Sequence, residues 1–325
     1  MKLEVKRVDW RHKAPFRISY SESTHAETVM VQLRDGDLAG RGEASGVAYR
    51  GETAASLQQQ LEGLPAHFFD GLTRENLQER LPAGGARNAL DCALWDLDAK
   101  RAGKRAWELA GIDEVKVLRT AFTLSLDTPA AMAKAAAEAA VFDILKLKLG
   151  GEGDIDRVSA VRDIRPEVEI IVDANQAWRP AQLESFVHGL ADLGVLLIEQ
   201  PLPAGDDVAL RGFESPIPIC ADESIQTASS LADLADRYQF INIKLDKTGG
   251  LTEALRLADQ AKALDLGLMT GCMMGSSLAM APAFVVAQRC AFVDLDGPLW
   301  SSTDIANAID YRGSDMFPPS AQLWG

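Results

Sequence analysis

Short apolar segments alternate with amphipathic ones over most of the chain after residue 116. Eight apolar segments have the length and β-branched content of strands: Arg119–Leu126, Ile144–Leu149, Val168–Asp173, Val195–Glu199, Ile217–Asp222, Phe240–Lys244, Leu266–Gly271 and Phe292–Asp294. Helical stretches fill the seven gaps, at residues 128–140, 153–164, 180–193, 207–213, 228–237, 251–264 and 276–288. This alternation predicts an α/β fold, a modified TIM barrel of the (β/α)7β type that lacks its last helix.

The chain before this region has a different pattern. Residues 1–33 alternate as a strand ribbon, Gly36 and Gly40 mark turns, and helical stretches follow at residues 52–69 and 86–102. We therefore expect an α+β unit over residues 1–115 and a barrel over residues 116–297. Residues 298–325 form a tail that we expect to return to the first unit.

Composition restricts the classes of partner. The chain has 325 residues and a net charge of −14, which disfavours binding to nucleic acid. No apolar run approaches the roughly 18 residues that a membrane span needs, and the N-terminus does not have the pattern of a signal peptide. The four cysteines form no close pair. These features predict a cytoplasmic protein without a nucleic-acid or membrane partner.

Charged side chains stand at the ends of five predicted strands. They are Lys146, Lys148, Asp173, Glu199, Asp222 and Lys244, and successive strands carry them 22 to 26 residues apart. That spacing is one strand, one loop and one helix, and parallel strands in a barrel deliver their C-terminal residues to a single mouth. Any one of these residues could be an ordinary polar group at a strand end. Six of them in this register favour a common site.

The residue types indicate a chemistry. Asp173, Glu199 and Asp222 offer three hard oxygen ligands, which suit Mg²⁺. A substrate carboxylate neutralised by the metal could lose its α-proton to a base through an enediolate-like state. Lys146 beside Lys148 and a metal is a plausible source of a neutral amine. Lys244 lies four strands further round the barrel and is expected to face the substrate from the opposite side.

Several motifs together resemble the enolase superfamily, muconate-lactonizing subgroup, and within it the dipeptide epimerases of the L-Ala-D/L-Glu type. The motifs are Gly85–Asp96, Lys146-Leu-Lys148, Asp173-Ala-Asn175, Glu199–Pro203, Asp222-Glu-Ser224, Asn242–Gly250 and Asp294–Pro298. The resemblance covers essentially the whole chain. It implies that the first unit is a capping domain, whose loops near residues 17–25 and 47–52 close over a dipeptide substrate.

The resemblance also implies residue roles. One Mg²⁺ per subunit would be held by Asp173, Glu199 and Asp222, and Lys148 and Lys244 would be acid/base catalysts on opposite faces of the α-carbon. Lys146 would bind the carboxylate and favour the neutral form of Lys148. Asn175 and Asp246 would contact these site residues without touching the substrate, although Asp246 could equally be a solvated loop residue.

The Asp294 and Asp296 pair separates activities within the family. By the resemblance, this pair holds the α-ammonium of a dipeptide, and a buried ammonium needs such acceptors. Cycloisomerases and o-succinylbenzoate synthases act on substrates without that cation. None of the four histidines lies at the end of the seventh strand, which argues against sugar-acid dehydratases and mandelate racemases.

The preferred side chain is less clearly indicated. Ser21 and Glu22 occupy the approximate position where some relatives use an arginine for the distal carboxylate of Ala-Glu, so Arg50, or else Arg17, is expected to supply this charge. The prediction is L-Ala-D/L-Glu first. Alternatives are cationic or hydrophobic dipeptides, cycloisomerase, o-succinylbenzoate synthase or N-acylamino-acid racemase activity, and an idle barrel that only binds metal and an acidic ligand. The sequence also allows a homo-oligomer.

Overall fold

An antiparallel sheet and a set of helices form the N-terminal part of the computed structural model, which describes residues 1–325. The sheet contains β1 (Lys2–Ile18), β2 (Ser21–Asp35) and β3 (Leu38–Ala44), and the helices are α1 (Ala54–Glu62), α2 (Arg74–Arg80), α3 (Gly85–Ala102) and α4 (Ala106–Leu109). Helix α3 packs directly on β3 because Gly40 and Gly42 have no side chain there. A Cβ at Gly40 would lie 2.0 Å from the Ala93 backbone oxygen.

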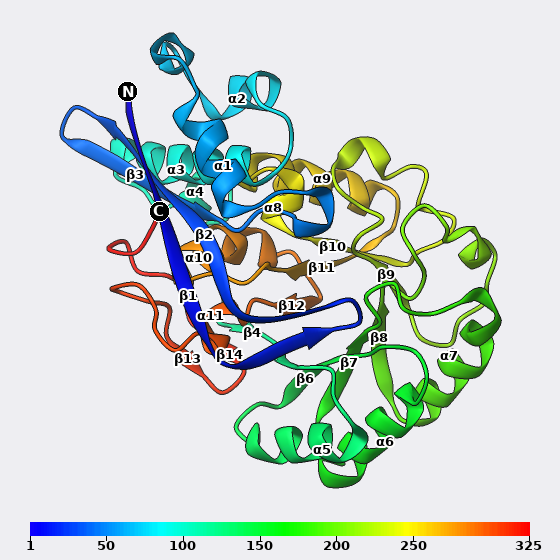
Figure 1. Ribbon diagram of the computed structural model, residues 1–325. Coiled ribbons are helices and arrows are strands. Elements are labelled where there is room, and N and C mark those ends of the chain that lie inside the picture. The colour runs from blue at the N-terminus through cyan, green and yellow to red at the C-terminus, as the bar shows by residue number, and fades with distance from the viewer.

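Eight parallel strands form the second part, as the sequence predicts. They are β5 (Phe122–Leu124), β6 (Ile144–Lys148), β7 (Glu169–Asp173), β8 (Val195–Glu199), β9 (Ile219–Ala221), β10 (Phe240–Ile243), β11 (Gly267–Gly271) and β12 (Phe292–Asp294), hydrogen-bonded in sequence order. The Ala121 amide donates to the Val293 carbonyl at 2.8 Å, which joins the first strand to the last. The predicted fold class is confirmed, and Figure 1 shows the blue β1–β2 hairpin reaching over the strand ends.

The connections between strands differ from the prediction at two places. Helices α5 (Pro129–Glu138), α6 (Asp154–Ile164), α7 (Leu183–Asp192), α9 (Leu251–Ala263) and α10 (Ser277–Ala287) are present. The predicted helices at 207–213 and 228–237 are wrong, because only 3-10 turns form at Val208–Leu210 and Ala228–Ser230. Gly212 ends the first in a left-handed conformation (φ 70°). In the second, the Thr227 and Ser230 hydroxyls bond within the turn and compete with helical hydrogen bonds.

Alternation along the strands divides the barrel interior into two layers. Six buried residues, Ala121, Ile144, Ile171, Leu197, Cys220 and Met269, pack together as a separate apolar cluster. Two residues further along the same strands, the inward positions become Lys146, Asp173, Glu199, Asp222 and Gly271. The apolar layer therefore forms a floor, and the charged residues lie above it at the C-terminal end of the strands.

The C-terminal tail contacts both parts. Strand β14 (Asp315–Met316) pairs with β13 (Tyr311–Arg312) on one side and with β4 (Leu118–Arg119) on the other, outside the barrel sheet. Two short helices, α8 (Leu245–Thr248) and α11 (Gly297–Trp300), follow β10 and β12. The fully buried Trp324 donates its indole N–H to the Cys92 carbonyl of α3 at 3.0 Å, and the Gly325 amide donates to Asp96 at 2.8 Å. No helix has both the length and the apolar content to span a membrane.

Candidate active site

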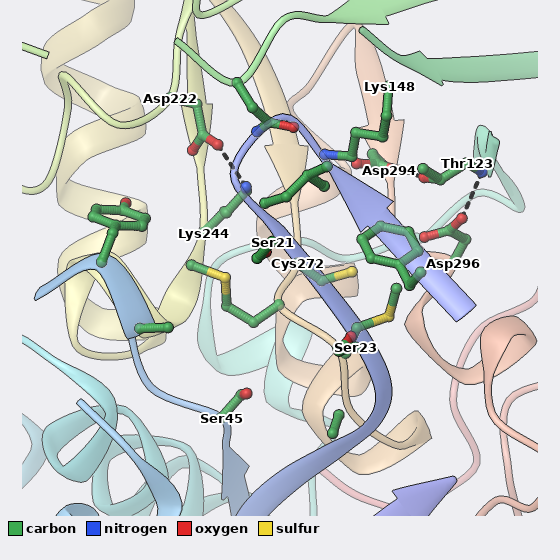
Figure 2. A pocket seen from close by; sticks show the side chains of 18 of the residues that line it. Ser21, Ser23, Ser45, Thr123, Lys148, Asp222, Lys244, Cys272, Asp294 and Asp296 are labelled. Atoms are coloured by element: carbon green, nitrogen blue, oxygen red, sulfur yellow. Dashed lines mark hydrogen bonds and ion pairs between the residues drawn. The ribbon is translucent and has the colours of Figure 1, made fainter. Parts of the chain in front are cut away.

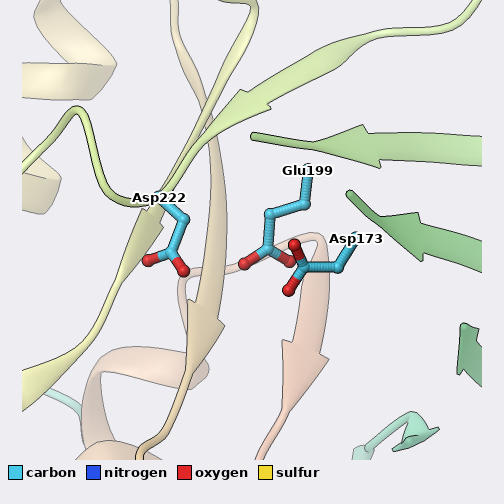
Figure 3. Close-up of side chains that lie close together, drawn as sticks. All are labelled: Asp173, Glu199 and Asp222. Carbon is cyan, nitrogen blue, oxygen red and sulfur yellow. The ribbon is translucent and has the colours of Figure 1, made fainter. Parts of the chain in front are cut away.

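Three carboxylates converge at the ends of β7, β8 and β9. Asp173, Glu199 and Asp222 are at most 2% exposed, and one oxygen of each lies within 4.8 Å of the others (Figure 3). Register explains the meeting, because Asp173 pairs directly with Glu199 across β7 and β8. Burial, and then the neighbouring Asp173 charge, raise the pKa of Glu199 to about 7. A like-charged cluster of this kind is costly unless cations neutralise it.

The chemistry of the cluster fits a bound cation. Four buried oxygens there accept no hydrogen bond: Asn175 Oδ1, Glu199 Oε2, Glu223 Oε2 and Asn242 Oδ1. Lys146 Nζ lies 2.7 Å from Glu199 Oε2, at ion-pair distance but without hydrogen-bond geometry. Buried polar atoms are normally paired, so these free oxygens mark a place for a positive ligand. Three carboxylates and surrounding amide oxygens are the donors that Mg²⁺ prefers.

Three lysines surround the carboxylates. Lys148 Nζ lies 2.6 Å from Asp173 Oδ2, and Lys244 Nζ lies 2.6 Å from Asp222 Oδ2. Lys146 Nζ reaches Asp173 at 3.3 Å as well as Glu199. Burial opposes the charged form of Lys244, but Asp222 and Glu199 outweigh it and raise its pKa well above the usual value. In this arrangement the carboxylates favour the charged form of Lys244, so a neutral amine there requires another charge in the cluster.

The backbone is strained just after the two strands that end in Asp173 and Glu199. Asn175 (φ 41°) and Gln200 (φ 34°) adopt left-handed conformations directly after the strands that carry Asp173 and Glu199. The Gln200 side chain compensates by accepting the Asp222 amide at 2.8 Å and donating to the Leu202 carbonyl at 2.8 Å. It thereby ties the end of β8 to the end of β9.

Several residues of the site were missed by the sequence analysis. Lys247 is 1% exposed and bonds the Asp222 carboxylate, while Asn242 donates to Glu199 Oε1 at 2.8 Å. Glu223 lines the cavity, and burial followed by the Asp222 charge raise its pKa to about 8. Lys247 lies in the short helix α8 and not at a strand end, so strand spacing could not identify it. Asn242, on β10 two residues before Lys244, could have been found from strand alternation.

Asp294 and Asp296 approach the cluster from the end of β12. Asp294 pairs with Lys146 Nζ at 2.7 Å and accepts the Thr123 hydroxyl at 3.2 Å, while Asp296 accepts the Thr123 amide at 2.7 Å (Figure 2). Burial, and then the Asp294 charge, raise the pKa of Asp296 to about 7. A cation bound beside the pair would favour its ionised form.

A cavity of about 330 Å³ joins these groups to the capping hairpin. Its walls contain Lys146, Lys148, Asp222, Lys244, Asp294 and Asp296 from the barrel, and His12, Phe16, Ile18, Tyr20, Ser21, Ser23 and His25 from β1 and β2. Figure 2 shows Ser21 and Ser23 on the hairpin across the cavity from the strand-end residues. The Ser19 hydroxyl donates to the Asn175 carbonyl at 2.8 Å and holds the hairpin tip against β7. The volume suits a small molecule of dipeptide size.

The structure places the two arginines that the sequence analysis proposed as substrate ligands outside the wall of this cavity. Arg17 pairs with Glu22 at 2.6 Å and with Asp127 at 2.7 Å, outside the cavity. Arg50 donates to Gln226 and is also absent from the cavity wall. Alternation along β1 turns Arg17 away because its neighbours Phe16 and Ile18 face inward. Of the hairpin residues predicted to touch substrate, only Ser21 lines the cavity.

Asp246 connects the capping loop to the segment that carries Lys244. One carboxylate oxygen accepts the Ser45 amide at 3.0 Å and the Gly46 amide at 2.8 Å, and both donors precede the loop at residues 47–52. Burial is the main cause that raises the pKa of Asp246 to about 7. The structure therefore places this residue in the interface and not in solvent.

Both parts of the chain match models of one family. Residues 1–111 match the mandelate racemase/muconate lactonizing enzyme N-terminal domain, and residues 129–318 match the enolase C-terminal domain-like model. The chain is 44% identical to the L-Ala-D/L-Glu epimerase of Escherichia coli K12, with 94% of this chain and 96% of the relative covered. It is 42% identical to the N-acetyl-D-glutamate racemase of a Pseudoalteromonas species, with 91% and 95% covered.

Solved structures give the same relationship. An enolase family member from Agrobacterium tumefaciens, described with bound sodium and L-Ala-L-Glu, superposes with a TM-score of 0.97 at 45% identity and 99% coverage of both chains. The dipeptide epimerase of Enterococcus faecalis, in complex with Mg and L-Leu-L-Tyr, superposes with a TM-score of 0.92 at 28% identity, with 99% of this chain and 98% of that chain covered.

Replacing Asp246 by Asn should change how stability depends on pH. The folded-state pKa of about 7 exceeds the ordinary carboxyl value, so the folded state binds more protons than the unfolded state between about pH 4 and 7. The contribution of Asp246 to stability therefore falls as pH rises through this window. Asp246→Asn should gain stability relative to the wild type from pH 4.5 to 7.5, measured by urea unfolding. A constant difference, like that expected for the exposed Asp233→Asn control, would contradict the assignment.

Proposed function

The chain belongs to the mandelate racemase/muconate lactonizing enzyme family of the enolase superfamily, and from this premise we propose that it is a Mg²⁺-dependent dipeptide epimerase. The proposed reaction is a two-base 1,1-proton transfer at the α-carbon of the C-terminal residue, with L-Ala-D/L-Glu as the first substrate. One observation carries the proposal. Lys148 and Lys244 stand at the ends of β6 and β10, on either side of the carboxylate cluster, and both face the same cavity.

Asp173, Glu199 and Asp222 would hold one Mg²⁺. When bound, the ion would neutralise the substrate carboxylate and stabilise the negative charge that develops when the α-proton leaves. Lys247 bonds Asp222 Oδ1 and the backbone at Asp222 and Asn242, so it keeps this carboxylate in place when Lys244 departs. Asn242 performs the same task for Glu199.

Lys148 and Lys244 would exchange protons with opposite faces of the α-carbon. One amine accepts the α-proton, and the other, as an ammonium, donates a proton to the other face, so the configuration inverts with no net gain or loss of protons. Each lysine shares its carboxylate with the proposed metal site. A metal charge at Asp222 would weaken the pair that favours the ammonium form of Lys244, so that amine could become neutral.

Asp294 and Asp296 would receive the α-ammonium of the dipeptide. Their burial and carboxylate chemistry support this assignment, because a buried ammonium gains from two nearby carboxylates. N-acylamino-acid racemisation is the second candidate, favoured by the similarity to the N-acetyl-D-glutamate racemase. That substrate has no ammonium, so it offers no cation to the Asp pair.

The cellular setting belongs to the proposal as well. The four cysteines are all free, which supports a reducing, cytoplasmic location. A homo-oligomeric state stays a prediction. The partner that we propose is the dipeptide alone, with no role for nucleic acid given the net charge of −14.

Metal removal should abolish the reaction. Treatment with EDTA should reduce epimerisation of L-Ala-L-Glu to background, and Mg²⁺ should restore it. Asp222→Asn should weaken Mg²⁺ binding at least about tenfold, measured by isothermal titration calorimetry, because it removes one of three charged ligands. The exposed Asp233→Asn variant should bind as the wild type does. Full turnover by metal-depleted enzyme would contradict the metal assignment.

Exchange of the α-proton in D₂O tests the reaction itself. The wild type should incorporate deuterium into both L-Ala-L-Glu and L-Ala-D-Glu, read by mass spectrometry, whereas an idle binding barrel would incorporate none. Lys148→Ala and Lys244→Ala should each slow epimerisation by about 10²-fold or more. Each variant should still exchange the one isomer whose α-proton faces the remaining lysine. Equal loss of exchange for both isomers in both variants, with substrate still bound, would refute the two-base assignment.

Asp296 distinguishes the two candidate reactions. Asp296→Asn should lower kcat/KM for L-Ala-L-Glu by about 10- to 100-fold, because a hydrogen bond to a charged group contributes about 1.5–3 kcal/mol. The same change should leave turnover of N-acetylglutamate unchanged or higher. A wild type that prefers N-acetylglutamate, with both substrates equally affected by the substitution, would favour the racemase instead.

A further inference from the structure

The cavity wall on the capping hairpin carries no arginine. The basic side chains that line the whole cavity are Lys146, Lys148 and Lys244 on the barrel side and His12 and His25 on the hairpin side. The three lysines already form ion pairs with carboxylates at the C-terminal end of the barrel strands. A substrate with a second carboxylate therefore needs a donor from the hairpin, and this must be something other than a guanidinium.

His12 is the unusual group on this wall. It is 6% exposed, and neither imidazole nitrogen makes a hydrogen bond, although the ring lines the cavity. The Phe16 ring stands edge-on to it with 6.4 Å between centroids. Burial is the main cause that lowers the pKa of His12. An imidazole without a partner in such a place costs desolvation free energy, and a ligand that accepts its N–H would recover that cost.

Other polar groups on the hairpin wall could also bind an anion. Ser21 and Ser23 from β2 line the same wall and provide hydroxyl donors. The Ser23 backbone oxygen favours the protonated ring, and so does the Asp9 carboxylate, while the charge of His25 opposes it. A substrate carboxylate would act in the same direction as Asp9, since an opposite charge at contact distance favours the imidazolium.

We propose that His12 is a specificity-determining residue, which donates a hydrogen bond to the distal carboxylate of an acidic C-terminal residue, while the Ser21 and Ser23 hydroxyl groups lie on the same wall. The inference rests on the proposed dipeptide epimerase function and identifies the substrate class as acidic dipeptides. The apolar part of the wall, at Phe16, Ile18 and Tyr20, then contacts the methylene groups of the side chain. The imidazole N–H and the serine hydroxyl groups serve as the anion site on this hairpin.

The test compares three substrates of similar length, L-Ala-L-Glu, L-Ala-L-Gln and L-Ala-L-Met. His12→Phe keeps an aromatic ring and removes both nitrogens. It should lower kcat/KM for L-Ala-L-Glu by about 10- to 100-fold, mostly through KM, in line with the loss of one hydrogen bond to a charged group. Turnover of L-Ala-L-Met should change less than about threefold. His12→Gln retains a donor and should recover part of the loss, which separates recognition from folding.

Matched variants and the wild type keep the outcomes separate. His25→Phe makes the same chemical change at an exposed position of the same wall and should have little effect. Equal losses for all three substrates in His12→Phe, or a loss in His25→Phe alone, would overturn the proposal. A wild type that prefers L-Ala-L-Met over L-Ala-L-Glu would also overturn the proposal for His12. It would leave the proposed epimerase function intact. Absence of α-proton exchange with every dipeptide would instead refute the proposed function.

Discussion

The buried cluster of opposite charges at the barrel mouth is the constraint on which the rest of the structure depends. Three carboxylates lie within 4.8 Å of one another and are almost completely inaccessible to solvent, so they require cations on every side. The lysines at β6, at the end of β10 and in α8 provide cations around the cluster. The same arrangement allows a competing cation to release the lysines. Electrostatic balance thus links the stability of the mouth to the chemistry proposed for it.

The capping part completes the cavity by contacts to the same strand ends. Asp246 holds the Ser45–Gly46 backbone from the segment that follows Lys244, and the Ser19 hydroxyl bonds the loop that follows Asp173. Arg87 of α3 also donates to the Thr248 carbonyl at 2.6 Å. Residues on both sides of the cavity are therefore fixed relative to each other by hydrogen bonds, which favours a defined substrate orientation.

The sequence predicted the barrel well because strand alternation and strand-end charge follow one physical rule. In a parallel sheet buried on both faces, a charge can stand only where the strand leaves the core, so Asp173, Glu199 and Asp222 could be aligned by spacing alone. The absence of full helices after β8 and β9 could not be predicted, because it depends on the left-handed conformation of Gly212 in the first connection and on side-chain hydrogen bonds of Thr227 and Ser230 in the second. The direction of the Arg17 side chain could not be predicted for a similar reason. Whether a side chain of the hairpin points toward the cavity depends on the register between β1 and β2, and this register shifts between Arg11 and Phe16.

The position of the tail has a consequence for the order of assembly. Trp324 and Gly325 fill the space beside α3, whose sequence is completed more than two hundred residues earlier. During synthesis this helix leaves the ribosome long before the indole that covers it, so the packing around Cys92 and Asp96 stays open until Trp324 and Gly325 have been made. Domains generally fold as units from the N-terminus during translation. Here helix α3 obtains the indole that covers it only from residue 324, so the cap and the barrel reach their final packing together and late.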